Sequence, residues 1–213
     1  MPVSHELRCI FIHIPRTGGT SIERALGMFR DWKVENREAI FGLIQSRDLQ
    51  GKVSITQFLQ HASAREVRDL LPPQCANYFS FAFVRNPWDR MVSIFCHKDP
   101  NLAMCLAAAG IDLQSLSFDQ FLGTARAFGH VHLVPQTKFI YDDRGACFVD
   151  FLGRFEHLER DFAAVTQHLR IDAELSWHNR STHGDYRQYY DDRRRQLVAE
   201  LYREDIEAFG YEF

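Results

Sequence analysis

The sequence lacks the patterns that mark membrane-spanning and exported proteins. No apolar stretch approaches the roughly 20 residues that a membrane-spanning helix needs, so we expect no membrane span. Residues 1–14 do not have the shape of a signal peptide, because their short apolar part runs directly into a loop. No internal repeat and no low-complexity segment is present. These absences predict an ordinary globular protein of the cytoplasm.

Cysteine is sparse and follows no motif. The five cysteines are an odd number, they are scattered along the chain, and no C-x-x-C spacing occurs. A disulfide framework and a zinc site are therefore both unexpected. Reduced thiols in the cytoplasm are the simplest interpretation.

An excess of charge of one sign is also lacking. Lysine and arginine number 25 and aspartate and glutamate 28, which gives a net charge of -3. No global basic field favours nucleic acid or an anionic membrane as a partner, so any anion site must be built locally. The composition, 46% apolar and 25% charged, suits one domain over residues 1–213. Nothing in the pattern indicates an oligomeric state.

Apolar strands followed by amphipathic helices recur along the chain. Residues 8–14 predict a buried strand rich in Ile and Phe, and apolar residues at helical spacing predict a helix over 20–28. Residues 78–84 and 151–155 predict two further core strands, and a helix is expected to begin at Pro87. This order predicts an α/β fold with a central, mostly parallel sheet and helices on both faces.

Weaker local patterns complete the expected secondary structure. S-x-x-E at 63–66 and S-x-x-Q at 117–120 predict capped helices. Residues 138–149 predict a hairpin, with a D-D-R-G turn between two short strands. Residues 172–190 have no period and predict a loop, whereas the apolar spacing over 197–209 predicts one long C-terminal helix.

The segment PRTGGTS, residues 15–21, links the first predicted strand to the first predicted helix. Its glycines let the backbone turn tightly and approach a ligand closely, and the N–H groups of the helix point toward a bound group. Arg16 adds a permanent charge, and Thr17, Thr20 and Ser21 add hydroxyl donors. This chemistry predicts a phosphate or sulfate site. The alternative is an ordinary strand-to-helix turn.

A second loop repeats this logic. Arg85 closes the second core strand, and Ser93 follows eight residues later in the next helix. The two side chains can grip one phosphate from two sides. Alone, they favour the alternative of an arginine that caps the sheet edge and an exposed helix serine. Because Arg16 and Arg85 both follow strands, where ligands of parallel sheets bind, the two loops together predict a ligand with two separated anionic groups.

Two other enzyme classes use similar loops. A P-loop kinase or NTPase would need G-x-x-x-x-G-K-[ST] and a carboxylate for magnesium, and this loop offers neither in the right order. A tyrosine phosphatase would need C-x5-R, whereas Cys9 and Arg16 are spaced C-x6-R and Cys9 falls inside the predicted strand. A non-catalytic nucleotide-binding module remains the alternative from another class.

The segments IFIHIPRTGGTS and FAFVRNPWDRMVS resemble the two nucleotide motifs of the sulfotransferases. The likeness is to the branch that includes carbohydrate 2-O- and 4-O-sulfotransferases and small bacterial members. It continues through later segments and covers nearly the whole chain: QHASAREVRDLL, VPQTKFIYDDRG, VDFLGRFEHLERDF, YRQYYDD and DIEAFGYEF. The resemblance implies a single P-loop-like domain. It also implies 3′-phosphoadenosine 5′-phosphosulfate (PAPS) as the donor, 3′-phosphoadenosine 5′-phosphate (PAP) as the product, a hydroxyl acceptor, expected on a sugar, and no metal.

The resemblance also assigns residues of the donor site. It implies that the 5′-phosphosulfate binds to the first loop, at Arg16, Thr17, Gly18, Gly19, Thr20 and Ser21. Arg85 and Ser93 would bind the 3′-phosphate, and Arg180 and Ser181, in a late basic loop, would contact the 3′-phosphate or adenine unless that loop is simply solvated. The family usually has lysine where this chain has Arg16, so Arg16 is expected to act by charge and not by proton transfer.

A histidine is expected to serve as general base. His61 precedes a capped helix and matches a histidine that serves as base in sequences similar to the sugar 2-O-sulfotransferases. His132 is the second candidate, as base or as part of the acceptor site, and His13 is interpreted as structural. Tyr186, Tyr189 and Tyr190 could line the acceptor cleft or fix the late loop.

Overall fold

The structure is a computed structural model, and it describes residues 3–28, 59–70, 73–142, 144–176 and 183–213. The chain divides into two compact units, each built from two stretches. We call the first the sheet unit (Met1–Val84 and Lys138–Asn179) and the second the helical unit (Arg85–Thr137 and Arg180–Phe213).

The sheet unit contains a four-stranded sheet in the order β1-β2-β3-β4. The three longer strands run parallel to one another, and only the short β1 is antiparallel to its neighbour. The strands are β1 (Val3–Ser4), β2 (Cys9–Ile12), β3 (Phe79–Val84) and β4 (Phe151–Arg154). The prediction of three core strands in a mostly parallel sheet is therefore confirmed.

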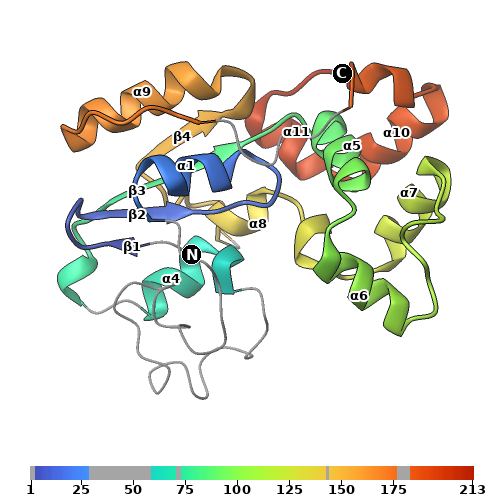
Figure 1. Cartoon of the computed structure of the whole chain (residues 1–213), viewed down its shortest axis with the longest axis horizontal. Helices are drawn as coiled ribbons and strands as arrows, with labels where there is room; N and C mark the ends of the chain where they lie inside the picture. The colour runs from blue at the N-terminus through green and yellow to red at the C-terminus, as the bar shows by residue number, and fades with distance from the viewer. Residues whose placement is uncertain (1–2, 29–58, 71–72, 143, 177–182) are drawn as a thin grey trace. The chain divides into compact units, whose positions relative to one another are not determined.

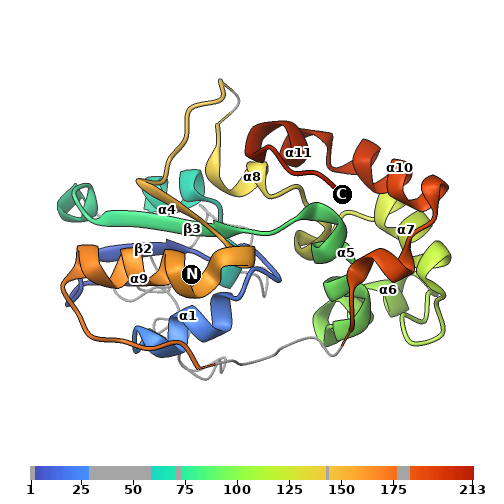
Figure 2. The same ribbon diagram turned by 90° about the horizontal axis from the view of Figure 1, so that it is seen from above.

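Helices cover both faces of this sheet, as predicted. Helices α1 (Gly19–Ala25) and α9 (Leu158–Leu169) lie on one face, and α4 (Ala64–Leu70) lies on the other (Figures 1 and 2). Alternate side chains of β2 and β3 point toward α1 and α9, and the rings of Phe11 and Phe81 stack with centroids 5.0 Å apart. Burying each such aromatic side chain stabilises the fold by roughly 2–3 kcal/mol.

The helical unit is built around α5 (Pro87–His97), which packs against α10 and against the 3-10 turn η6. Asn86 caps α5 by accepting the N–H groups of Trp88 and Asp89, and the capping box of Ser117 and Gln120 opens α7 as predicted. The remaining elements are α6 (Pro100–Ala108), α7 (Phe118–Ala127), η4 (Val131–Leu133), η6 (Tyr186–Tyr189), α10 (Asp192–Leu201) and α11 (Arg203–Phe209).

The predicted hairpin over residues 138–149 is wrong in its first strand. The chain instead forms the short helix α8 (Thr137–Ile140), and only an isolated antiparallel bridge joins Tyr141 to Cys147. The buried carboxylate of Asp205 accepts the N–H of Thr137, and this cap favours a helical turn. Because Asp205 lies far away in the sequence, the local pattern could not include its effect.

The single long C-terminal helix is also a wrong prediction. Tyr202 adopts non-helical backbone angles and separates α10 from α11. Its hydroxyl donates to the carbonyl of Leu133 at 2.9 Å, and its ring is buried. The apolar spacing runs unchanged through this break, so periodicity alone does not reveal it.

Candidate functional site

The loop between β2 and α1 has a backbone that alternates in hand. Arg16 (φ 68°) and Gly18 (φ 86°) are both in the left-handed region, whereas Thr17 between them is not. Alternation of hand from one residue to the next makes a concavity in which successive N–H groups converge, the arrangement that binds phosphate in many proteins. The hydroxyl of Thr17 donates to the carbonyl of Ile14 at 2.9 Å and closes this loop from within.

Both glycines of the loop are needed for close packing. A Cβ on Gly18 would lie 3.0 Å from the Cδ2 of Leu158, and one on Gly19 would lie 2.1 Å from the Nε2 of His13. Any larger residue at either position would displace α9 or the His13 ring. The loop is therefore held between two parts of the sheet unit.

A buried polar cluster lies directly beneath the loop. The Nδ1 of His13 lies 2.6 Å from a carboxylate oxygen of Glu23, and Gln60 donates to the same carboxylate at 3.1 Å. Burial raises the pKa of Glu23, but the charge and hydrogen bond of His13 and the bond from Gln60 outweigh it and hold that pKa below its ordinary value. Glu23 is therefore held as a carboxylate against the His13 ring.

His61 lies next to this cluster, in η2 (Leu59–His61). Its Nδ1 lies 2.8 Å from the backbone carbonyl oxygen of His13, and the two rings meet edge to face with centroids 4.7 Å apart. Ser63 and Glu66 form the predicted capping box of α4 immediately afterwards. The His13 ring thus contacts both His61 and Gly19, the first residue of α1.

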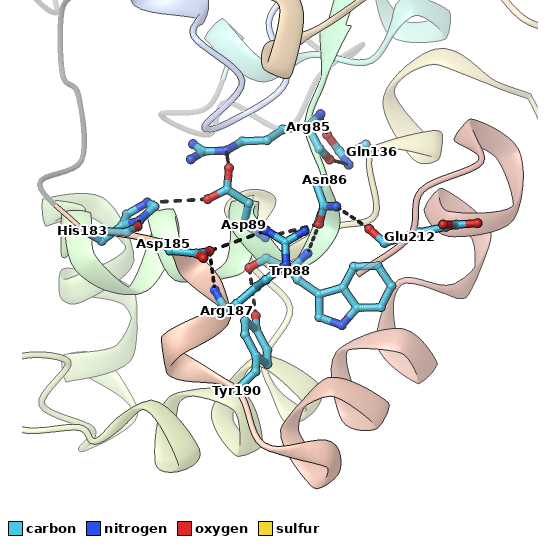
Figure 3. A network of polar contacts seen from close by, with 11 residues as sticks. Arg85, Asn86, Trp88, Asp89, Gln136, His183, Asp185, Arg187, Tyr190 and Glu212 are labelled. Carbon is cyan, nitrogen blue, oxygen red and sulfur yellow. Dashed lines mark hydrogen bonds and ion pairs between the residues drawn. The ribbon is translucent and has the colours of Figure 1, made fainter.

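Arg85 follows β3 directly and belongs to the helical unit. Its Nε donates to Asp89 at 2.8 Å, and the other oxygen of Asp89 lies 3.8 Å from the Nε2 of His183 (Figure 3). Asp89 therefore orients Arg85 and engages one of the five N–H donors of its guanidinium group.

Gln136 fixes the backbone of Arg85. The N–H of Arg85 donates to the side-chain oxygen of Gln136, and the side-chain nitrogen of Gln136 donates back to the Arg85 carbonyl, both at 2.8 Å. Asp205 in turn accepts the N–H of Gln136 at 2.9 Å. These buried hydrogen bonds hold the backbone of Arg85 in a single position.

Two further residues that the sequence predicts for the site, Ser93 and His132, are buried in the structure. Ser93 is fully buried within α5, and His132 is buried in η4 with its Nδ1 3.9 Å from Asp99. Arg180 and Ser181 lie outside the described residues.

Tyr190 and Tyr189 fix the late loop to α5. The hydroxyl of Tyr190 donates to the carbonyl of Trp88 at 2.8 Å (Figure 3), and the hydroxyl of Tyr189 accepts from the Sγ of Cys96 at 3.5 Å. Tyr186 packs edge-on against Tyr190. Of the two roles considered for these tyrosines, the contacts favour fixing the loop.

Sequence reasoning missed three residues of these sites: Glu23, Asp89 and Gln136. Glu23 could have been found, because it falls on the inward face of α1, one turn after Gly19. Asp89 could also have been found, since it lies four residues after Arg85 at the start of a helix. No local signal marks Gln136, whose partner Arg85 is distant in the sequence.

Cys9 is not a candidate nucleophile. It lies inside β2 with no exposed surface, and burial raises the pKa of its thiol to about 12. A thiol held protonated in this way cannot serve phosphatase chemistry, which agrees with the C-x6-R spacing.

In the part of the chain that the structure describes, none of the helices is both long enough and apolar enough to cross a bilayer. In the same residues, no group of three or more His, Cys, Asp or Glu side chains is arranged to hold a metal ion.

The sequence model of the sulfotransferase family matches residues 1–212. The chain belongs to the sulfotransferase family. Searches of curated proteins and of solved structures each returned no match. Family membership makes the chain a transferase of sulfuryl groups, and its α/β architecture with a mostly parallel sheet fits the P-loop-like fold of sulfotransferases.

Proposed function

We propose that this protein transfers a sulfuryl group from PAPS to a hydroxyl group of a carbohydrate or glycoconjugate. The observation that supports this most is the loop between β2 and α1, whose backbone alternates in hand at Arg16 and Gly18. A concavity of this kind suits the 5′-phosphosulfate of the donor. All five cysteines are free thiols, which is consistent with a cytoplasmic enzyme.

The first loop, Arg16 to Ser21, is the proposed site for the 5′ end of the donor. By analogy with phosphoryl transfer, negative charge develops on the oxygen that leaves sulfur as the acceptor hydroxyl attacks in line. Arg16 and the loop N–H groups stabilise that charge, and one such donor is typically worth about 3 kcal/mol. Arg16 keeps its proton and acts by charge alone.

Arg85 is the proposed ligand of the 3′-phosphate, with Ser93, Arg180 and Ser181 as further contacts. Asp89 holds the Arg85 side chain at its Nε, and Gln136 holds the backbone. Both contacts reduce the conformational freedom that Arg85 would lose on binding a phosphate.

His61 is the proposed general base. A backbone carbonyl can only accept, so the Nδ1 of His61 donates to His13 and the lone pair of the neutral ring is on Nε2. A positioned base of this kind contributes about 10²–10⁴-fold to the rate. His132 remains the proposed contact for the acceptor.

Calorimetric titration with PAP, adenosine 5′-diphosphate (ADP) and adenosine 5′-triphosphate (ATP) tests the donor site. We expect micromolar binding of PAP and no comparable binding of ADP, which lacks the 3′-phosphate. Preference for ATP with magnesium, or no binding of PAP, would contradict the proposal. Transfer of labelled sulfate from PAPS to a panel of sugars then separates an enzyme from a non-catalytic PAPS-binding module.

A further inference from the structure

We propose that His13 and Glu23 form a positioning dyad that sets the affinity of the first loop for the 5′-phosphate of the donor. The proposal deepens the proposed function and rests on it. Neither residue is part of the loop, and neither was assigned a role in binding the donor above. Their role follows from four contacts within the sheet unit.

The His13 ring joins the loop to α1. Its Nδ1 side meets the carboxylate of Glu23 at 2.6 Å, and its Nε2 side occupies the space that a Cβ on Gly19 would fill. Gly19 is the first residue of α1, and Glu23 lies one turn later on the same helix. The ring therefore fixes the distance and direction between the loop and the helix that follows it.

The two groups of the dyad are ordered with respect to the loop. The His13 ring lies against Gly19, and the carboxylate of Glu23 lies one helical turn further from the loop. Both side chains are almost fully buried, at 6% and 5% exposure, so solvent screens their field only weakly. The imidazole end of the dyad is therefore the end that lies next to the proposed anion loop.

Packing alone does not explain a buried polar pair at this position. The desolvation of a buried carboxylate offsets much of what its contacts contribute, and apolar residues of similar size often stabilise a core equally well or better. The neighbouring Phe11 ring, stacked on His13 at 5.5 Å, shows that this core already accommodates an aromatic hydrocarbon. A carboxylate and an imidazole buried here are consistent with a task in ligand binding.

The dyad also reaches the proposed base. The carbonyl of His13 accepts the Nδ1–H of His61 at 2.8 Å, and Gln60, the preceding residue, donates to Glu23. One residue thus contacts the loop, the helix and the base. A shift of His13 would move all three.

The first test compares Glu23→Gln with the wild type by titration with PAP and with adenosine 3′-phosphate, which lacks the 5′-phosphate. We expect Glu23→Gln to lower the affinity for PAP about tenfold and to leave the affinity for adenosine 3′-phosphate unchanged, because the dyad acts on the 5′ end of the donor. Unchanged affinity for PAP, or equal losses of affinity for both ligands, would overturn the proposed role of the dyad. If the wild type itself fails to bind PAP, the proposed function fails first.

His5→Phe is the matched control. It removes a histidine of the same unit whose Nδ1 lies 2.8 Å from the hydroxyl of Tyr78, which precedes β3 at the opposite end of the strand from the loop. We expect it to lower the melting temperature without changing PAP affinity. A loss of PAP affinity equal to that of Glu23→Gln would show that destabilisation alone explains the effect, and would overturn the proposal.

A second variant pair keeps the test decisive if Glu23→Gln folds poorly. Gly19→Ala should collide with the ring of His13, and His13→Ala should remove the nearest colliding atoms. The double variant is expected to fold better than Gly19→Ala alone but to bind PAP at least tenfold more weakly than the wild type. Wild-type PAP affinity in the double variant would show that the ring only fills space.

Discussion

The Nδ1 atom of His61 lies 2.8 Å from the backbone carbonyl oxygen of His13, the residue whose ring packs against Gly19 at the start of α1. This contact sets the tautomer of His61 and turns its Nε2 into the basic atom of the neutral ring. It also ties the proposed base to the loop through a single residue.

His61→Ala is expected to reduce turnover by about 10²–10⁴-fold, because the acceptor hydroxyl loses its base. PAP affinity should stay close to that of the wild type, since the proposed base acts on the acceptor hydroxyl and not on the donor nucleotide. The measurement is kcat with whichever acceptor the wild type sulfates, together with a PAP titration. His132→Ala serves as the comparison, and full turnover by His61→Ala would assign the base elsewhere.

The parts of the fold that the sequence predicts well are those set by local chemistry. The apolar runs that became β2, β3 and β4 had to be buried, and the glycines between β2 and α1 permit the left-handed backbone at Gly18. The capping boxes at Ser63 and Ser117 formed as expected. Each of these signals depends only on neighbours within a few residues.

The parts that escaped prediction depend on distant partners. Gln136 pairs with the backbone of Arg85 across 51 residues of sequence, and Asp205 turns a predicted strand into α8 from 68 residues away. The hydroxyl of Tyr202 breaks the last helix by a bond formed across 69 residues. Such contacts exist only once the chain has folded, so no local pattern encodes them.

Gly18→Ala is expected to lower the free energy of unfolding by about 3 kcal/mol, from left-handed strain plus the displacement of Leu158. Gly27→Ala is the matched control, because Gly27 also has a positive φ (65°) but nothing lies within 4 Å of the position that its Cβ would take. Gly27→Ala should lower the free energy of unfolding by only about 1 kcal/mol. Urea unfolding of the two variants measures the difference, and equal losses would show that packing around the loop is loose.

Arg16→Lys tests whether the charge or the proton of this residue matters. The family usually has lysine here, and lysine can both neutralise the leaving oxygen and give it a proton. We expect PAP affinity to be kept within a few-fold and kcat to be equal or higher. Arg16→Ala should lower kcat by about 10²–10³-fold, as removal of one charge-stabilising donor usually does. A large loss of kcat in Arg16→Lys would instead mean that the forked geometry of arginine is required.

The stability of the fold should depend on Glu23 in acid. The pKa of Glu23 is lowered in the folded protein from an ordinary value of 4.5, because the effects of His13 and Gln60 outweigh that of burial. A carboxyl group with a lowered folded pKa contributes stability that is fully present above its unfolded pKa and is lost as the pH falls through its folded pKa. The stability difference between wild type and Glu23→Gln should therefore be constant above about pH 5.5 and shrink below about pH 4.5. Urea unfolding of both proteins at a series of pH values above and below this range measures the difference. A difference that stays constant down to the most acid condition would mean that folding does not lower the pKa of Glu23 and that its contacts do not favour the carboxylate.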